Sequence, residues 1–301
     1  MRIFRRSLDL SLASPREATP ADLSGISRLF RNSTHRFLGF PSTDLPTMLS
    51  SVPTMLLVVG DEICGAAIGG WRTDGVIWLR GLALANNLPL GGGLDSLLPP
   101  FHALLRSLGV RRLFYAGDEA ADTWLGSALR ERGYVYDTEV VVYEKRELSV
   151  PAWGNQEVRV RPAEAVDLPA VLAVDQACFD PQWSKDEGII GPALFESPFF
   201  IVAQLNSAVI GYAFVTIHFG GRLVHLVRIA VHPSYQRREI GVRLLGEIIA
   251  HARAVGAGSV TLNTQANNTS AQRLYEWFGF RRTGEVQTVL RFDLPQLHGA
   301  G

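Results

Sequence analysis

The stretch from Val227 to Gly241, VRIAVHPSYQRREIG, has the residue types of an anion-binding loop. An apolar run ends at a polar turn, arginines follow, and a helix-forming sequence begins at once. The first N–H groups of a helix have no partner within it and meet the positive end of the helix dipole, so this layout predicts a seat for a phosphate. Glu239 complicates the prediction, because it brings a Cβ and a charge to a position where glycine is expected.

Glu239 is expected to weaken such a site rather than abolish it. A carboxylate ~8 Å from a phosphate, at an effective dielectric of about 20, costs roughly 2 kcal/mol for each pair of unit charges. A carboxylate that points into solvent is largely screened, and Arg237 or Arg238 then compensates for it. An acid at the start of a helix is also favoured by the dipole alone, so both interpretations of Glu239 stay open.

Length and composition indicate two ordinary globular domains. The 301 residues suffice for two domains of about 150 residues each. Lys plus Arg equals Asp plus Glu at 29 each, so no net field attracts the chain to nucleic acid or to a membrane surface. Cys64 and Cys178 lie far apart without CxxC spacing, which argues against a zinc site and a disulfide framework.

The expected location is cytoplasmic. The first residues, MRIFRRSLDLSLASP, are basic, but Asp9 and several serines interrupt any apolar segment of a signal peptide. No apolar stretch approaches the ~20 residues that a membrane span needs. We therefore expect neither a membrane nor a nucleic acid as partner, and the sequence leaves the oligomeric state open.

The two halves of the chain repeat one another. REATPADLSGI aligns with RPAEAVDLPAV, so that Arg16 matches Arg161 and Asp22 matches Asp167, both pairs 145 positions apart. Further short matches follow in the same order. The boundary is expected in ELSVPAWGNQE, residues 147–157, where Pro, Gly and Asn cluster between two strand-like runs. The predicted domains are residues 1–148 and 156–301.

The second half alternates strand-like and helix-like segments. RLVHLVRIAVHP is apolar on both faces and predicts a central strand. After the loop, Leu245, Ile248, Ile249 and Ala252 form one apolar helix face. Strands with interspersed helices, ending in an antiparallel pair, predict an α+β fold of three α/β/α layers. Each domain is therefore expected to be a mixed, mostly antiparallel sheet covered by helices.

Two segments of the second half resemble the GCN5-related N-acetyltransferases, the GNAT superfamily. VRIAVHPSYQRREIGVRLL is similar to the family's pyrophosphate loop, Gln/Arg-x-x-Gly-x-Gly/Ala, except at Glu239, and LNTQANNTSAQRLYEWFGF follows at the usual separation. The second motif resembles the ribosomal-protein N-terminal acetyltransferases, and the tandem layout resembles mycothiol synthase. The resemblance covers about residues 157–294, and residues 1–148 look like a degenerate GNAT-like copy.

The resemblance implies acetyl-CoA as the donor and an amine as the acceptor. In the family, backbone groups of the central strand bind the pantetheine, one N–H faces the thioester oxygen, and loop N–H groups bind the pyrophosphate. The residues that this implies for cofactor binding are Ile229, Ala230, Val231, Gln236, Arg237, Arg238, Glu239, Ile240, Gly241, Val242, Asn268 and Tyr275.

The resemblance also implies the catalytic groups. Tyr275, seven residues after Asn268, falls where the family places its general acid, although it also fits the apolar stripe of its helix. Asn263 stands where the ribosomal N-terminal acetyltransferases carry a glutamate, and an amide cannot accept a proton at neutral pH. His225, six residues before Val231, is the candidate base, with a buried structural histidine as the alternative.

No metal site is expected, although three histidines recur every seven residues. His218, His225 and His232 lie on different predicted segments, so they do not form a ligand set.

The N-terminal copy lacks the catalytic residues. It keeps Gly91 and Gly93 but has Leu88 at the start of its loop, and Leu129 and Trp78 stand at the positions of the acid and the base. A structural half is the first interpretation, and a second, non-reactive CoA site is the other.

The predicted function is transfer of an acetyl group from acetyl-CoA to a primary amine of a small molecule or a protein. The acceptor-facing segment, residues 178–198, has no strong charge bias; Asp180 and Asp186 near Trp183 suit a cationic amine or a solvated turn equally. Two alternatives stay open. One is a mycothiol-synthase-like acyltransferase, and the other is a non-catalytic CoA-binding module, suggested by Glu239 together with Asn263.

Overall fold

The computed structural model describes residues 8–295 and divides the chain into two compact units. The first unit comprises Met1–Asp137 and Gln287–Gly301, and the second comprises Thr138–Val286. The outermost parts of the predicted domains, residues 1–7 and 296–301, lie outside the described residues, as does the start of the segment assessed for a signal peptide. Within residues 8–295, no helix has the length and apolar character to cross a membrane.

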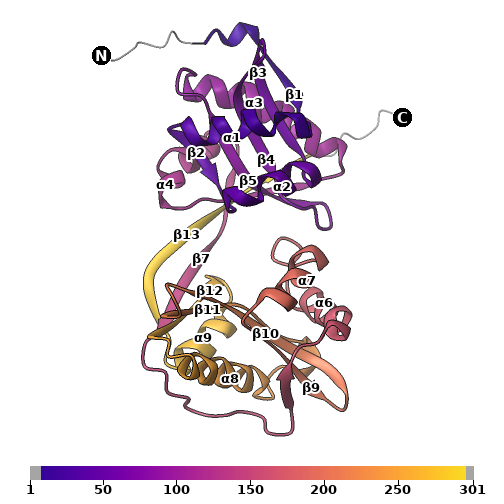
Figure 1. Ribbon diagram of the computed structural model, residues 1–301, viewed down its shortest axis with the longest axis vertical. Helices are drawn as coiled ribbons and strands as arrows, with labels where there is room; N and C mark the ends of the chain where they lie inside the picture. The colour runs from indigo at the N-terminus through magenta and orange to yellow at the C-terminus, as the bar shows by residue number, and fades with distance from the viewer. Residues whose placement is uncertain (1–7, 296–301) are drawn as a thin grey trace. The chain divides into compact units, whose positions relative to one another are not determined.

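The first unit is a sheet with helices on both faces (Figure 1). The sheet runs in the order β1-β3-β4-β5-β6-β13, and β2 pairs with β5. Helices α1 and α2 cover one apolar face, and α3 and α5 cover the other. The strands are β1 (Ala13–Glu17), β2 (His35–Leu38), β3 (Thr54–Val59), β4 (Glu62–Gly69), β5 (Val76–Leu84) and β6 (Arg112–Ala116), and the helices are α1 (Leu23–Asn32), α2 (Leu45–Ser51), α3 (Leu90–Ser107), α4 (Glu119–Ala121) and α5 (Ser127–Arg130).

The second unit repeats this architecture, in the order β8-β9-β10-β11-β12-β7. Only β11 and β12 are parallel among these pairs, so the mixed, mostly antiparallel sheet is as predicted. Helices α6 and α7 pack on one face and α8 and α9 on the other. The elements are β7 (Val135–Lys145), β8 (Arg159–Pro162), α6 (Leu168–Cys178), α7 (Glu187–Glu196), β9 (Phe199–Leu205), β10 (Ala208–His218), β11 (Leu223–Val231), α8 (Ile240–Ala254), β12 (Ser259–Gln265), α9 (Thr269–Trp277) and β13 (Arg281–Asp293).

Two long strands begin in one unit and end in the other (Figure 1). From Thr138 onward β7 belongs to the second unit, where it pairs with β12 from Gln265↔Val140 to Val260↔Lys145. From Gln287 onward β13 belongs to the first unit, where it pairs with β6. The compact units therefore differ from the predicted ranges 1–148 and 156–301, because each half of the sequence contributes a strand to the other's sheet.

The segment expected to contain the domain boundary, residues 147–157, is packed against the second unit. The ring of Trp153 lies so close to α8 that a Cβ added to Gly246 would be 3.2 Å from it. Gln156 accepts a hydrogen bond of 3.0 Å from Arg243 on the same helix. The segment therefore runs against α8 and belongs to the second unit.

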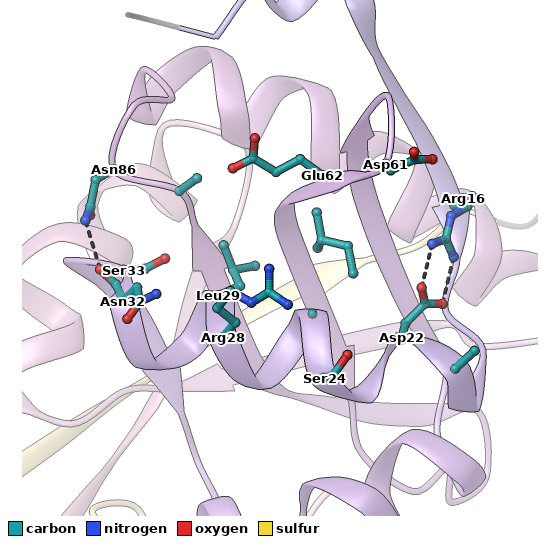
Figure 2. Close-up of a pocket in the computed structure, with 14 residues that line it drawn as sticks. Arg16, Asp22, Ser24, Arg28, Leu29, Asn32, Ser33, Asp61, Glu62 and Asn86 are labelled. Atoms are coloured by element: carbon teal, nitrogen blue, oxygen red, sulfur yellow. Dashed lines mark hydrogen bonds and ion pairs between the residues drawn. The ribbon is translucent and has the colours of Figure 1, made fainter. Parts of the chain in front are cut away.

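The internal repeat is visible as the same ion pair in both units. Arg16 pairs with Asp22 at 2.6 Å at the start of α1 (Figure 2), and Arg161 pairs with Asp167 at 2.7 Å at the start of α6. The arginine holds the pKa of each carboxyl below its usual range. Each carboxylate also accepts a backbone N–H three residues before it, which fixes the chain's entry into the helix. Residues aligned in sequence therefore perform one structural role twice.

The strand exchange predicts which fragments fold. Residues 138–286 contain the whole second unit and should unfold cooperatively in urea. Residues 156–301 lack the part of β7 that pairs with β12, together with the buried side chains of Val141 and Tyr143. This fragment should lose the cooperative transition, because an unpaired strand edge and an incomplete core remain. Circular dichroism of both fragments checks this; equal unfolding midpoints would contradict it.

Candidate active site

The central feature of the second unit is the parting of β11 from β12. The two strands pair only from Leu223↔Ser259 to Leu226↔Leu262. The register of β11 against β10 shifts at Val227, which is an extra residue between two paired positions. Such a bulge bends the strand and increases its local twist. From Val227 to Val231, β11 keeps β10 on one edge, and within residues 8–295 no strand pairs with its other edge.

A groove of about 880 Å³ lies at this parting. Its volume is typical of a site for a small molecule or cofactor. Its walls come from β11, β12, the loop before α8, the first turns of α8 and α9, and the end of α6. The lining residues are Cys178, Phe179, Leu226, Val227, Arg228, Ile229, Ala230, Val231, Gln236, Arg237, Glu239, Ile240, Gly241, Val242, Leu262, Asn263, Thr264, Gln265, Asn268, Ser270, Ala271, Leu274 and Tyr275.

The loop predicted to bind an anion forms one end of this groove. The first helical hydrogen bond of α8 runs from the Arg243 N–H to the Glu239 carbonyl at 3.0 Å. The N–H groups of residues 240–242 therefore have no acceptor within the helix and carry the positive end of its dipole. Every predicted cofactor-binding residue lines the groove except Arg238, whose guanidinium lies 5.5 Å from the centre of the Tyr235 ring.

Glu239 occupies a conformation that favours glycine. Its φ is 56° and that of Arg237 is 59°, so both residues lie in the left-handed region. A residue with a Cβ is disfavoured there by about 1 kcal/mol or more. The side chain of Glu239 is exposed and makes no capping hydrogen bond. The loop thus keeps the shape that glycine would adopt easily, and it carries the backbone strain of the substitution.

Tyr275 reaches the same groove from α9. It is 6% exposed, and its ring centre lies 6.1 Å from those of Tyr143 and Phe280. Burial raises the pKa of Tyr275 to about 12, with a smaller opposing effect from Arg228. The phenol therefore stays protonated at neutral pH, as a proton donor must. In the described part of the chain its hydroxyl has no hydrogen-bond partner, so it is available to a ligand.

Asn268 helps to place this helix. Its side chain caps α9 by accepting the Ala271 N–H at 3.2 Å, and both residues line the groove. Asn268 is thus brought to the site that the sequence predicted for it, where its side chain already serves the helix terminus.

His225 lies on β11 beside the groove but is not among its lining residues. Its Nδ1 is 3.0 Å from the Thr261 hydroxyl on β12, and the His218 ring centre is 6.5 Å away. Burial, and then the nearby His218, lower the pKa of His225 below 6.5. The imidazole is therefore neutral near pH 7 and can accept a proton. Across residues 8–295, no cluster of three or more His, Cys, Asp and Glu has the geometry to hold a metal.

A buried ion pair that the sequence reading missed forms the wall toward α6. Arg228 of β11 pairs with Asp175 of α6 at 2.7 Å, and the Asp175 side chain is fully buried. The Tyr212 hydroxyl donates to the same carboxylate, and Arg228 also donates to the Trp183 carbonyl at 2.7 Å. The guanidinium carbon lies 3.4 Å from the centre of the Phe179 ring. The sequence did contain a signal for this pair, because VRIAV and AVDQA each place one charged residue within an apolar run.

Asp180 and Asp186, which the sequence analysis considered as partners of a cationic amine, lie outside the groove. Asp186 caps α7, because its side chain accepts the Ile189 N–H at 3.2 Å. Asp180 closes a turn with its carbonyl, which accepts the Trp183 N–H at 2.8 Å. Neither residue lines the groove.

The first unit fills the equivalent positions with its own chain. Strand β5 parts from β6 after Trp78, as β11 parts from β12, but β2 pairs along its free edge from His35↔Leu84 to Leu38↔Gly81. At the start of α3, a Cβ on Gly92 would lie 2.5 Å from the Leu10 side chain, and Arg132 donates to the Gly91 carbonyl at 3.1 Å.

The hollow of about 440 Å³ in the first unit is a different feature (Figure 2). Polar side chains from β1, α1, the start of β4 and the segment after β5 surround it, among them Arg16, Arg28, Glu62 and Asn86. Its lining includes no residue of β5 or α3, so it does not correspond to the groove of the second unit.

Known proteins match this arrangement. The sequence model described as "Acetyltransferase (GNAT) family" matches residues 168–280. The chain is 29% identical over 138 residues to the [ribosomal protein bS18]-alanine N-acetyltransferase of Escherichia coli K12, covering 45% of this chain and 86% of that protein. It is 35% identical over 92 residues to the uncharacterized protein ML0378 of Mycobacterium leprae, covering 28% of this chain and only 23% of that protein.

A solved structure shows the tandem fold. The structure described as a tandem GNAT protein from the clavulanic acid biosynthesis pathway superposes with a TM-score of 0.61, at 11% identity, over 94% of this chain and 99% of that one. This likeness confirms the predicted arrangement of two GNAT-like folds in one chain. The family model and the sequence relatives show that residues 168–280 are similar to the acetyltransferases of the GNAT family, and the solved structure shows the fold.

Proposed function

We propose that the second unit transfers an acetyl group from acetyl-CoA to a primary amine of a small molecule or a peptide. One observation carries this proposal. The unpaired edge of β11, the free N–H groups at the start of α8 and the Tyr275 hydroxyl meet in a single groove. A pantetheine arm is an amide chain, a pyrophosphate is an anion, and a departing thiolate needs a proton, so each group has a partner of matching chemistry.

The residues divide the work along the groove. Backbone groups of Ile229, Ala230 and Val231 would hold the pantetheine as a neighbouring strand would, and one of their N–H groups would face the carbonyl oxygen that gains charge. The N–H groups from Glu239 to Val242 would hold the pyrophosphate. When bound, acetyl-CoA supplies an acetyl group activated as a thioester. The Tyr275 hydroxyl would then donate its proton to the sulfur as it leaves.

The acceptor is supported only as a class. The E. coli relative is named for acetylation of an alanine of a ribosomal protein, which supports a primary amine as the acceptor group. The wall toward α6 contains Arg228, but Asp175 balances its charge, so a cationic amine is not repelled there. We retain His225 as the proposed base. Its neutral imidazole would act directly or through water, since Asn263 in the groove wall cannot accept a proton.

The first unit is proposed to be structural and to bind no CoA. Its strand β2 already supplies hydrogen bonds to β5, at the positions where β11 remains open in the second unit. Leu10 and Arg132 cover the start of α3. No equivalent backbone edge is left for a pantetheine.

Calorimetry with CoA and an assay for thiol release from acetyl-CoA, across a library of amines, test the proposal together. One CoA per full chain is expected, with thiol release stimulated by at least one amine. Binding without release under any amine would instead indicate the non-catalytic CoA-binding module. Absence of CoA binding would overturn the acetyltransferase proposal, and two equivalents would overturn the structural role of the first unit.

Replacement of Tyr275 by Phe should lower kcat by about 10- to 100-fold or more, because the proton donor is lost while the packing volume is kept. Affinity for acetyl-CoA should change little. Tyr143→Phe is the matched control, since Tyr143 is also buried but its hydroxyl donates to Glu276 at 3.0 Å, outside the groove. An unchanged kcat in Tyr275→Phe would remove this residue from the mechanism.

The role of His225 is read from the pH dependence of the rate. Its pKa is lowered, so the imidazole stays neutral down to below pH 6.5, and the rate should fall only as the pH drops through that lowered pKa. His225→Gln should slow the reaction and flatten this acid limb. The control is His251→Gln: burial also lowers the pKa of His251, but its ring stacks on Phe199 away from the groove. If the acid limb of the pH–rate profile persists in His225→Gln and only the melting temperature falls, His225 has a structural role and is not the base.

A further inference from the structure

The loop before α8 holds a left-handed backbone at two residues that have a Cβ. Arg237 and Glu239 have φ values of 59° and 56°. The Glu239 side chain makes no capping hydrogen bond that would stabilise this conformation. A glycine would adopt these angles without strain. Something outside the loop must therefore favour this conformation over relaxed alternatives.

The segment before β8 makes the contacts that do so. The Asn155 side-chain amide donates to the Arg238 carbonyl at 3.1 Å. The Asn155 backbone N–H donates to the Glu239 carbonyl at 3.4 Å. Two consecutive carbonyls of the loop are thus held by one residue, which comes from a part of the chain more than eighty positions earlier.

These two hydrogen bonds also help to direct the N–H groups that would bind an anion. In a trans peptide, the carbonyl of one residue and the N–H of the next point in opposite directions. Asn155 holds the Arg238 carbonyl on its own side, so the Glu239 N–H points away from it. The Glu239 carbonyl also accepts the Arg243 N–H of α8 at 3.0 Å, so Asn155 and the helix together direct the Ile240 N–H. Glu239 and Ile240 both line the groove.

Gly154 allows this close approach. Its own φ is 63°, and an added Cβ would lie 2.4 Å from the Glu239 carbonyl oxygen and 2.7 Å from the Arg243 nitrogen. The turn is closed from within as well, because the Asn155 side-chain oxygen accepts the Glu157 N–H at 2.9 Å. Asn155 therefore reaches the loop from a braced position.

We propose that Gly154 and Asn155 are positioning residues for the cofactor loop, and that they take over the role that a glycine at position 239 would fill. The inference rests on the proposed function, since the loop is taken to bind the pyrophosphate of CoA. The segment that the sequence marks as a domain boundary is, on this view, part of the cofactor site without touching the cofactor.

A double-mutant cycle on the full-length protein tests the proposal, with CoA as the calorimetric probe. Asn155→Ala should weaken CoA binding by about fivefold, the effect of one hydrogen bond of ordinary strength. In the Glu239→Gly background the same substitution should cost less than about twofold, because glycine at position 239 adopts the left-handed φ without strain. In turnover assays, the loss in Asn155→Ala should fall on the KM for acetyl-CoA rather than on kcat.

The control is Asn86→Ala in the first unit. Like Asn155, Asn86 donates its side-chain amide to a backbone carbonyl, that of Asn32 at 2.8 Å, and accepts a backbone N–H with its side-chain oxygen. It does not line the groove, so its removal should leave CoA affinity within about twofold. Gly154→Ala should weaken binding more than Asn155→Ala, with its melting temperature recorded to show that it folds. An equal loss from Asn155→Ala in both backgrounds, or no loss in the native one, would overturn the proposal.

The melting temperatures of the four proteins of the cycle, which are the native protein, Asn155→Ala, Glu239→Gly and the double variant, separate this inference from the proposed function. Without ligand, Asn155→Ala should lower the melting temperature by a few degrees in the native background and by less with Glu239→Gly. If this coupling is found but no variant binds CoA, Gly154 and Asn155 do position the loop, and the acetyltransferase proposal is overturned. If CoA binds but neither the affinities nor the melting temperatures show coupling, only the positioning role of Gly154 and Asn155 is overturned.

Discussion

A strand edge carries N–H and C=O groups that must find partners, and the second unit leaves such an edge open between Val227 and Val231. The extra residue at Val227 turns β11 away from β12, which creates the opening and also aims the strand's end at the loop before α8. The groove, the free helix N–H groups and the approach of Tyr275 all follow from this parting. An open edge inside a groove is matched by a ligand with its own amide groups, which is why we attach the function to it.

Features that depend on neighbouring residues could be predicted from sequence. The loop Gln236–Gly241 and the strand before it are contiguous, and Tyr275 lies on a short helix whose start is fixed by Asn268. The alignment of the two halves matched Arg16 with Arg161 and Asp22 with Asp167, and the ion pair that each half forms spans only six residues. In these segments local chemistry and the final structure agree, as expected where each turn and cap is determined within a few residues.

Features that depend on distant residues could not be predicted in the same way. Periodicity identifies β7 and β13 as strands, but it does not specify a neighbour, and each pairs within the other half's sheet. The Arg228–Asp175 pair joins residues 53 positions apart, and neither local sequence names its partner. The Pro, Gly and Asn residues of 147–157 are typical of a linker. They form a brace because Gly154 also permits contact with Glu239, a relation that only the folded chain shows.

The two units satisfy the same constraint in opposite ways, and this supports the proposed division of labour more directly than the loss of catalytic residues does. In the first unit β2 pairs with the free edge of β5, and a partner tethered in the same chain has an effective concentration that a free ligand does not match. Once that edge is paired, an acid at the position of Leu129 would have nothing to protonate. Leu129 is fully buried in the apolar core, where a hydroxyl would lack a partner. The apolar Leu129 therefore suits a unit in which the chain itself pairs with this edge, whereas Tyr275 lines an open groove in which a ligand can reach its hydroxyl.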